Sequence, residues 1–230
     1  MSELVTYQLE DGVAILTLNN GKVNAISHEA LAALNSALDR AEQDQAVVVM
    51  TGQPGIFSGG YDLKEMQKGV AEALALVKVG SEMLRRLSTF PFPVIAACSG
   101  HAIAQGAFIL LASDYRLGVQ GSFKLGLNEV AIGMTMPHIL IEVARQRLAP
   151  AHFHRAVCTA EIYGPEGAVD AGFLDELTAP EELLSRAKAQ AKQFQSLNMT
   201  AFRQTKLRVN AGYLALLDEC MAKDFAGPGL

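Results

Sequence analysis

Residues 93–112, which read PVIAACSGHAIAQGAFILLA, contain the most informative pattern of this chain. The stretch opens with a short apolar run, which is typical of a β-strand buried on both faces. The pair Ser99-Gly100 breaks that run, and a helix over residues 105–112 would be apolar on every side. Such a helix belongs in the middle of a core. Strand, turn and buried helix in this order indicate an α/β protein.

The preceding part of the chain has the same organisation. Residues 46–50 are wholly apolar and predict a second buried strand. A loop over residues 51–55 ends it, and we expect one helix to follow through Leu87. The strand-turn-helix unit of residues 47–64 therefore recurs loosely at residues 94–112, as a structural similarity and not as a sequence repeat.

The two ends of the chain differ in character. The first segment alternates apolar and polar residues around Asp11-Gly12 and predicts a β-hairpin, and Ser27 caps a helix that follows. Downstream, residues 114–119 and 123–125 predict strands, and the pattern beyond Pro137 is helical. We expect an α/β core over residues 1–180 and a helical segment over residues 181–230.

Charge and composition exclude several classes of protein. The net charge is −5, and the Lys and Arg residues are scattered, which argues against nucleic acid as a partner but allows one phosphorylated small ligand. Cys98, Cys158 and Cys220 are far apart and odd in number, so we expect neither a disulfide framework nor a metal site, and a reducing cytoplasm is the simplest compartment. Neither a signal peptide nor a membrane-spanning stretch is evident.

Two glycine-containing turns carry the candidate chemistry. Residues 57–64, FSGGYDLK, and residues 99–106, SGHAIAQG, each follow a buried strand and open a helix. Glycine allows close approach of a ligand to the backbone, and a helix start leaves amide N–H groups unpaired. Two such amides aimed at one point make an oxyanion hole. Either turn alone is weak evidence, because it is more often an ordinary connection between strand and helix.

Taken together, the motifs resemble a known family. The order FSGGYDLKEM, PVIAACSGHAIAQGA, SDYRLG and GLNEVAIG is similar to that of the crotonase (enoyl-CoA hydratase/isomerase) superfamily. The resemblance implies a ClpP/crotonase-type ββα spiral core with a helical C-terminal segment, and a homotrimer or a dimer of trimers. It also implies that the backbone amides of Tyr61 and Gln105 bind the thioester oxygen of an acyl-CoA, with side-chain identity of little importance there.

The carboxylates distinguish the branches of this family. Its hydratases use two glutamates, the first of them three residues after the second oxyanion amide, where this chain has Phe108. The second position matches Glu129, within residues 126–129, GLNE, which resemble mitochondrial-type Δ3,Δ2-enoyl-CoA isomerases. A phenyl ring cannot hold water, whereas one carboxylate can carry a proton from C2 to C4 of a 3-enoyl thioester. We therefore expect an isomerase of fatty-acid degradation with Glu129 as its catalytic carboxylate.

The resemblance also implies where coenzyme A binds. The substrate carries this group, so no separate cofactor is expected. Backbone of two segments would contact adenine and pantetheine, Lys22 and Lys64 are the nearest cations for the phosphates, and Gly106 would allow close packing to the thioester. The implied binding residues are Lys22, Asn24, Ala25, Ile26, Gly59, Gly60, Asp62, Leu63, Lys64 and Gly106.

Several other residues and two other functions stay open. His101 and His138 are expected to line the pocket or form hydrogen bonds, and Asp114 to fix a strand. Met134 and Met136 line the acyl pocket or pack in the core. The alternatives to isomerisation are hydration or another lyase or hydrolase reaction on the same oxyanion hole, and non-catalytic binding of acyl-CoA.

Overall fold

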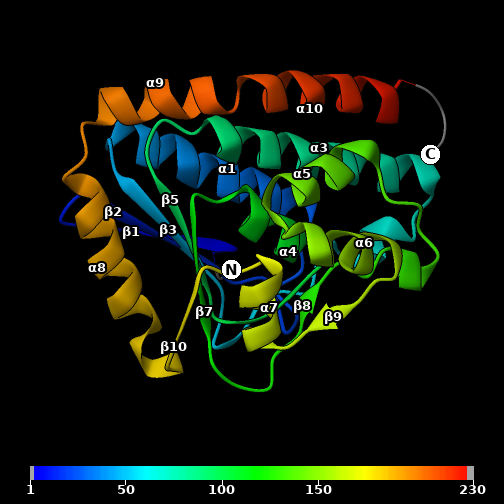
Figure 1. Ribbon diagram of the computed structural model, residues 1–230, viewed down its shortest axis with the longest axis horizontal. Coiled ribbons are helices and arrows are strands. Elements are labelled where there is room, and N and C mark those ends of the chain that lie inside the picture. Colours follow the sequence, from blue (N-terminus) through cyan, green and yellow to red (C-terminus); the bar gives the residue numbers. More distant parts are fainter. Residues whose placement is uncertain (1–2, 227–230) are drawn as a thin grey trace.

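The computed structural model of the chain describes residues 3–226 (Figure 1). Its strands are β1 (Val5–Glu10), β2 (Val13–Leu18), β3 (Val47–Thr51), β4 (Gly55–Ser58), β5 (Val94–Cys98), β6 (Gly100–Ile103), β7 (Tyr115–Val119), β8 (Leu125–Gly126), β9 (Ile162–Tyr163) and β10 (Glu176–Thr178). Its helices are α1 (His28–Gln43), α2 (Leu63–Met66), α3 (Val70–Thr89), α4 (Gln105–Ala112), η1 (Val130–Ile132), α5 (His138–Arg147), α6 (Pro150–Cys158), α7 (Pro165–Ala171), η2 (Pro180–Glu182), α8 (Leu183–Gln195), α9 (Met199–Val209) and α10 (Ala211–Asp224).

The larger sheet has six strands in the order β1-β2-β3-β5-β7-β10. The hairpin predicted for the first segment is confirmed, since β1 pairs antiparallel with β2. Its turn residues Asp11 and Gly12 have φ of 48° and 75°, as the two central residues of a tight hairpin turn require. The remaining neighbours in this sheet are parallel.

Both faces of this sheet are covered at its centre, which explains why β3 and β5 are buried along their whole length. Side chains alternate along β3, so Val48 and Met50 join the larger core, which also includes residues of α1, α3 and α4. Val47 and Val49 face the opposite way and join a smaller core beneath α8. The prediction of a doubly buried strand at residues 46–50 is confirmed, and α4 is buried along its whole length as predicted.

A second sheet with the order β4-β6-β8-β9 was only partly foreseen. The single helix expected after residue 55 is wrong: residues 55–58 form β4, and the helical part is divided into α2 and α3. Likewise, β6 begins at Gly100, where a turn was expected. The strand β4 has four residues and pairs with β6 far along the chain, so its partner leaves no local pattern in the sequence.

The recurring unit predicted from the sequence is present. The segments β3-β4-α2 and β5-β6-α4 each supply one strand to each sheet and then a helix. The strands β4, β6 and β8 are parallel neighbours, so their carboxyl ends meet at one edge of the second sheet. This edge positions the candidate site.

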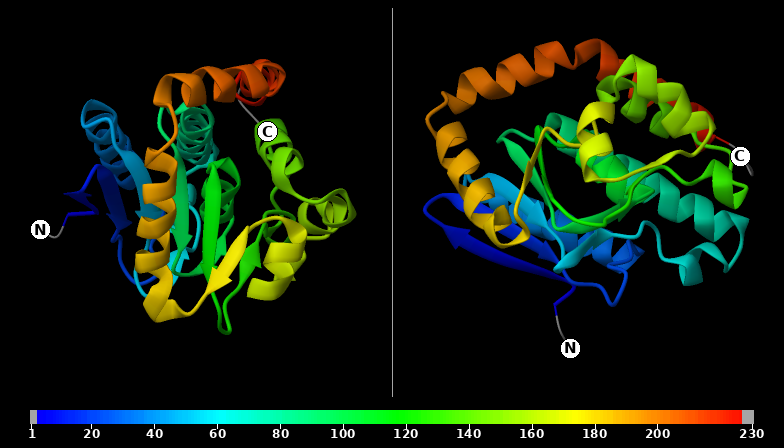
Figure 2. Two further views of the ribbon diagram at one scale, coloured as in Figure 1. Left: turned by 60° about the vertical axis from the view of Figure 1, so that its left-hand side comes forward. Right: turned by 60° about the horizontal axis from the view of Figure 1, so that its bottom comes forward.

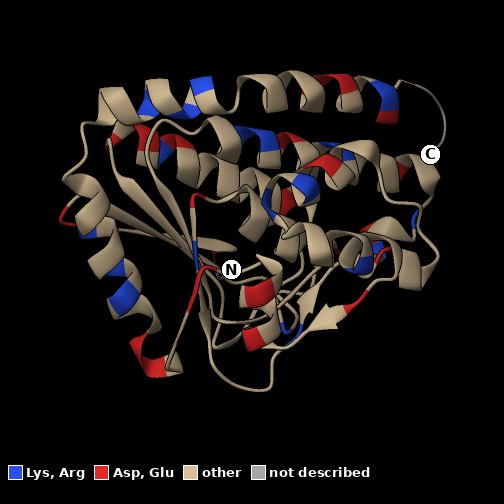
Figure 3. Cartoon of the chain, viewed as in Figure 1, with Lys and Arg blue, Asp and Glu red and all other residues tan. Residues whose placement is uncertain are grey.

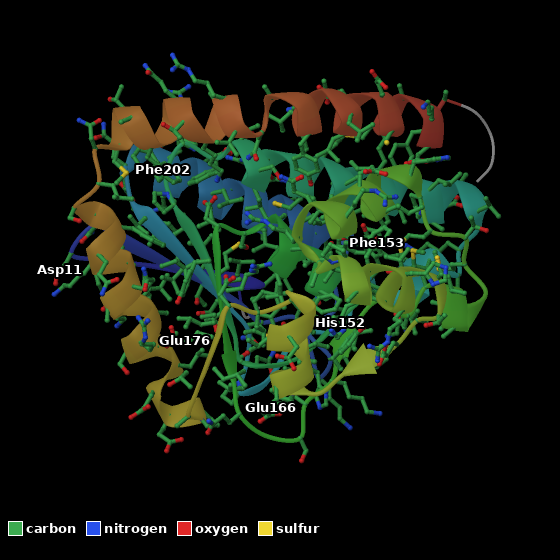
Figure 4. The ribbon with its side chains drawn as sticks, viewed as in Figure 1. Asp11, His152, Phe153, Glu166, Glu176 and Phe202 are labelled. Atoms are coloured by element: carbon green, nitrogen blue, oxygen red, sulfur yellow. The ribbon has the colours of Figure 1, made fainter. Side chains whose placement is uncertain are left out.

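The last three helices cover the core in different places. The helix α8 lies on the larger sheet, whereas α9 and α10 run along α3 and α5 (Figures 1 and 2). The Nζ atom of Lys206 on α9 donates to Asp114 at 2.7 Å, and it lies 5.6 Å from the ring centroid of Phe202, which is labelled in Figure 4. Asp114 also accepts from the amide of Val94, so its predicted structural role is confirmed. The division near residue 180 stays a prediction.

Two surface properties bear on the expected partners. Among residues 3–226, no helix is both long and apolar enough to cross a bilayer. Basic and acidic residues are interspersed along the helices in Figure 3. Cys98, Cys158 and Cys220 are free thiols.

Candidate active site

Three segments from separate parts of the chain meet at the edge of the second sheet. The turn with Gly60 and Tyr61 follows β4, Gln105 follows β6, and Glu129 follows β8. Because these strands are parallel neighbours, the chain leaves each of them on the same side. The three residues predicted as catalytic are therefore carried by three adjacent strand ends.

The first two turns are in direct contact. A Cβ atom built on Gly60 would lie 2.9 Å from Ala104 Cβ and 3.7 Å from the backbone nitrogen of Gln105. Gly60 also has φ of +96°, a conformation that disfavours side chains. A glycine at position 60 is thus required for the two predicted oxyanion amides to come together.

The amides of Tyr61 and Gln105 are both available to a ligand. Gln105 is the first residue of α4, so its N–H has no partner inside the helix. Within residues 3–226, neither amide donates a hydrogen bond to another group. Ala104, just before α4, has φ of 51° and ψ of −123°, a backbone conformation that costs a non-glycine residue about 1–3 kcal/mol. Such strain is typical of functional sites.

Glu129 is a buried carboxylate after β8, close enough to Tyr61 for its charge to affect the pKa of that side chain. Only 5% of the residue is exposed, and burial raises the pKa of its side chain to about 7, against a weaker opposing hydrogen bond from its own backbone. Its Oε2 atom has no hydrogen-bond partner within the described chain. A carboxylate with a pKa near neutrality is suited to accept a proton and to return it.

Asn128 is a polar residue of the site that the sequence analysis did not single out. Its Oδ1 atom is buried and, like Glu129 Oε2, has no partner among residues 3–226. Buried oxygens without partners on two consecutive residues are groups whose missing contacts a ligand can supply. The signal in the sequence is an asparagine between the apolar Leu127 and the candidate carboxylate Glu129.

The side chains of the two amide-bearing residues are also engaged. The Tyr61 hydroxyl donates to Gln105 Oε1 at 2.9 Å, and Gln105 Nε2 donates to the carbonyl oxygen of Gly80 on α3 at 3.1 Å. Burial, and then the charge of Glu129, raise the pKa of Tyr61 well above its ordinary value. Sequence reasoning treated these two residues as backbone donors, and nothing local predicts a bond between residues 44 positions apart.

The two segments predicted to contact coenzyme A lie side by side. Ile26 donates to Gly60 O at 2.8 Å and accepts from the Asp62 amide at 2.9 Å. Asn24 is fully buried, and its Nδ2 donates to Leu18 O and Phe57 O, each at 2.9 Å. Asn24 therefore joins the end of β2 to β4 and holds the two segments together.

The polar groups predicted for coenzyme A are exposed to differing degrees. Lys22 and Lys64 are exposed and form no ion pair with the described residues. Asp62 caps α2, where Oδ1 accepts from the Lys64 amide at 2.8 Å, and Leu63 is 64% exposed. Cations without partners beside an exposed apolar residue suit a ligand with both phosphates and an alkyl chain.

Gly106 has a structural reason that the sequence did not reveal. A Cβ atom there would lie 2.6 Å from the carbonyl oxygen of Ser58 and 2.9 Å from its Cβ. A side chain would therefore push α4 away from β4. The predicted packing of Gly106 against the thioester stays a prediction.

The remaining candidates have bonding or packing roles. His101 Nδ1 accepts from the Lys124 amide at 3.0 Å, and His138 Nδ1 lies 2.6 Å from Asp224 Oδ1, so both have the hydrogen-bonding role that was one of the two expected for them. Met136 and Phe108 belong to the larger core. Phe108 is completely buried, which leaves no room for water around its ring. Met134 is half-buried. Among residues 3–226, no cluster of His, Cys, Asp or Glu is arranged to hold a metal ion.

Comparison with known proteins places the chain in a family. The model of the enoyl-CoA hydratase/isomerase family matches residues 8–225. An enoyl-CoA hydratase/isomerase family protein from Pseudomonas syringae is 56% identical, with a TM-score of 0.95 over 96% of both chains. The chain therefore belongs to the enoyl-CoA hydratase/isomerase family and has the crotonase fold, as its motifs predict.

The names of other relatives divide between two reactions. The apo structure of the Mtb enoyl-CoA isomerase is 38% identical and covers 99% of this chain and 100% of its own, with a TM-score of 0.94. A probable enoyl-CoA hydratase of Bacillus subtilis is 29% identical over 195 residues, which is 83% of this chain and 75% of that protein. Family membership alone thus does not choose between isomerisation and hydration.

Proposed function

We propose that this protein is an enoyl-CoA isomerase, which converts a 3-enoyl-CoA into the conjugated trans-2-enoyl-CoA in fatty-acid degradation. The observation that carries the proposal is one buried carboxylate, Glu129, whose pKa is raised to about 7, combined with a fully buried phenyl ring at Phe108. One carboxylate suffices to move a proton. Adding water across a double bond, as the family's hydratases do with two glutamates, requires that a water be held in place.

The proposed reaction begins with the thioester carbonyl. The amides of Tyr61 and Gln105 donate hydrogen bonds to its oxygen, and each such donor is typically worth roughly 3–4 kcal/mol in the transition state. Ionised Glu129 removes a proton from C2, and negative charge spreads over the dienolate and the thioester oxygen. The protonated Glu129 then returns the proton at C4, and the double bond lies between C2 and C3.

The site has features that support both halves of this cycle. At neutral pH a carboxylate with a pKa of about 7 is divided between its two protonation states, so it can act as base and then as acid. Burial keeps water away from the protonated Glu129, and this favours return of the same proton to the substrate. The coenzyme A moiety is proposed to contact residues 24–26 and 59–64, with Lys22 and Lys64 near its phosphates.

Hydration is the second candidate, because relatives such as the Bacillus subtilis protein carry that name. In that case Glu129 alone, or with Asn128, would hold the water. Non-catalytic binding of acyl-CoA is the third. The homotrimer or dimer of trimers expected from the family resemblance is likewise a proposal.

One experiment separates these candidates. The protein is incubated with cis- and trans-3-enoyl-CoA and with trans-2-enoyl-CoA, and products are followed by ultraviolet absorbance and mass. Isomerisation produces conjugated-enoyl absorbance from the 3-enoyl substrates without a change in mass. Hydration removes that absorbance from the 2-enoyl substrate and adds the mass of one water. A protein that only binds acyl-CoA leaves all three substrates unchanged.

A further inference from the structure

The side chains of Tyr61 and Gln105 form a bonded chain that the proposed chemistry does not use. The hydroxyl of Tyr61 donates to Gln105 Oε1 at 2.9 Å, and Gln105 Nε2 donates to Gly80 O at 3.1 Å. We call these two hydrogen bonds the amide tether. They join the turn after β4 to the first residue of α4, and both of these to α3.

The tether lies where hydrogen bonds are most effective. Gln105 is completely buried, so water does not compete for its amide group. A hydrogen bond in such a low-dielectric environment is stronger than the same bond in water, and loss of one partner leaves the other unsatisfied. Burial and the nearby Glu129 carboxylate raise the pKa of Tyr61, so its hydroxyl stays protonated and remains a donor.

The helix α3 is shaped to accept the tether. A Cβ atom on Gly80 would overlap the hydroxyl oxygen of Tyr61 and would lie 2.8 Å from two of its ring carbons. Glycine in the interior of a 20-residue helix is unfavourable by itself. At this position it provides the space for the Tyr61 ring and leaves the carbonyl oxygen of residue 80 within reach of Gln105.

We propose that Tyr61 and Gln105 are positioning residues as well as amide donors: their side chains hold the two backbone amides at the spacing that one thioester oxygen requires. The inference rests on the oxyanion hole of the proposed function. It does not depend on the choice between isomerisation and hydration, since both reactions use the same polarised carbonyl.

The experiment compares variants that remove the tether but keep both backbone amides. Tyr61→Phe removes the hydroxyl, Gln105→Met removes the amide group at similar length, and the double variant removes both. Tyr115→Phe is the matched control, because the Tyr115 hydroxyl also donates to a side chain, Glu176 Oε2 at 2.8 Å, but Tyr115 lies on β7 beside β10.

Two measurements report on the amides. Steady-state kinetics with a 3-enoyl-CoA gives kcat and KM separately. The absorbance of bound 4-(dimethylamino)cinnamoyl-CoA moves to longer wavelength in proportion to polarisation of its carbonyl, and this probe needs no isomerase activity. Circular dichroism checks that each variant is folded, and Gln105→Met alone tests the tether should Tyr61→Phe fail to fold.

We expect each single variant to lower kcat about tenfold or more, with KM within about twofold, because a donor misplaced by 1 Å can cost about a hundredfold. The red shift of the probe should shrink in the same variants and persist in Tyr115→Phe. The double variant should lose no more than the worse single variant, because both changes break one tether.

The contrary outcomes are distinct. Single variants that keep the wild-type kcat and red shift, or losses that multiply in the double variant, would overturn the tether. A wild-type protein that produces no red shift when it binds the probe would instead overturn the oxyanion hole, and the proposed function with it.

Discussion

The Tyr61 hydroxyl occupies the place where a side chain at Gly80 would begin. Tyr61 lies just after β4 and Gly80 is in the middle of α3, so this contact fixes the helix against the turn that carries one of the two candidate oxyanion amides. Gly80 does not stand out in the sequence, but through this contact it helps to determine the geometry of the site.

Gly80→Ala should reduce both stability and activity. In an exposed helix interior, a change from glycine to alanine stabilises by up to about 1 kcal/mol. Here the new methyl group collides with Tyr61, so we expect destabilisation of roughly 1–3 kcal/mol, as for other overpacked core sites. Gly212→Ala on α10 is the control, since a Cβ atom there meets nothing within 4 Å. In thermal denaturation, Gly80→Ala should lower Tm, whereas Gly212→Ala should raise Tm or leave it unchanged. A Gly80→Ala variant as stable as the wild type would contradict the contact between Gly80 and Tyr61.

The pH dependence of the reaction should report on Glu129. Burial raises the pKa of this carboxyl from 4.5 to about 7, and only its ionised form can remove the C2 proton. The value of kcat/KM should therefore fall tenfold for each pH unit below about 7 and level off above it. An inflection near 4.5 would mean that the free enzyme solvates Glu129, contrary to its observed burial.

The same shift makes a prediction for stability. Because the folded-state pKa lies above the unfolded value, the folded protein holds this proton more tightly, and the associated stability is present below pH 4.5 and lost as pH rises through about 7. The shift corresponds to roughly 3 kcal/mol. Glu129→Gln cannot ionise, so by urea unfolding it should exceed the wild type in stability at pH 8 by up to that amount and match it near pH 4.5. If the difference in stability between Glu129→Gln and the wild type is the same at pH 8 and near pH 4.5, the pKa of Glu129 is not raised by burial.

Phe108 should prevent hydration at this site. If its buried ring excludes a second carboxylate and a water, the wild type should hydrate trans-2-enoyl-CoA hardly at all. Phe108→Glu should introduce slight hydration, at a cost of a few kcal/mol for a carboxylate in the core, so folding must be checked before the assay. Rapid hydration by the unmodified protein, measured as loss of conjugated absorbance, would rule out the isomerase-only account.

Much of the core was predictable because its periodicity is local. The strand at residues 46–50 and the buried helix at residues 105–112 follow from runs of apolar residues, and Ser27 accepts from the Ala30 amide as the predicted cap of α1. The strands β4, β6, β9 and β10 were missed, the last two because the pattern beyond Pro137 predicts only helix; all four have two to four residues and pair with distant segments. Propensity carries little information at that length.

The candidate site was predictable for a different reason. Residues 57–64, residues 99–106 and Glu129 were placed together by family resemblance and by the need for two unpaired amides, and adjacent strand ends carry all three. Side-chain partners were not predictable. The contact of Tyr61 with Gln105 spans 44 residues, and the bond from the His138 amide to Asp224 spans 86, so only the folded chain brings them together.

The role of Glu129 as the group that moves the proton can be measured by assay of Glu129→Gln with a 3-enoyl-CoA. The exposed Glu166 on α7 provides the matched control, Glu166→Gln (Figure 4). We expect Glu129→Gln to lose nearly all formation of conjugated-enoyl absorbance while it binds acyl-CoA within a few-fold of the wild type, and Glu166→Gln to retain full turnover. Removal of a general base typically lowers turnover by about 10²–10⁴-fold. If Glu129→Gln retains more than about a tenth of the wild-type turnover, another group moves the proton and the proposed role of Glu129 is contradicted.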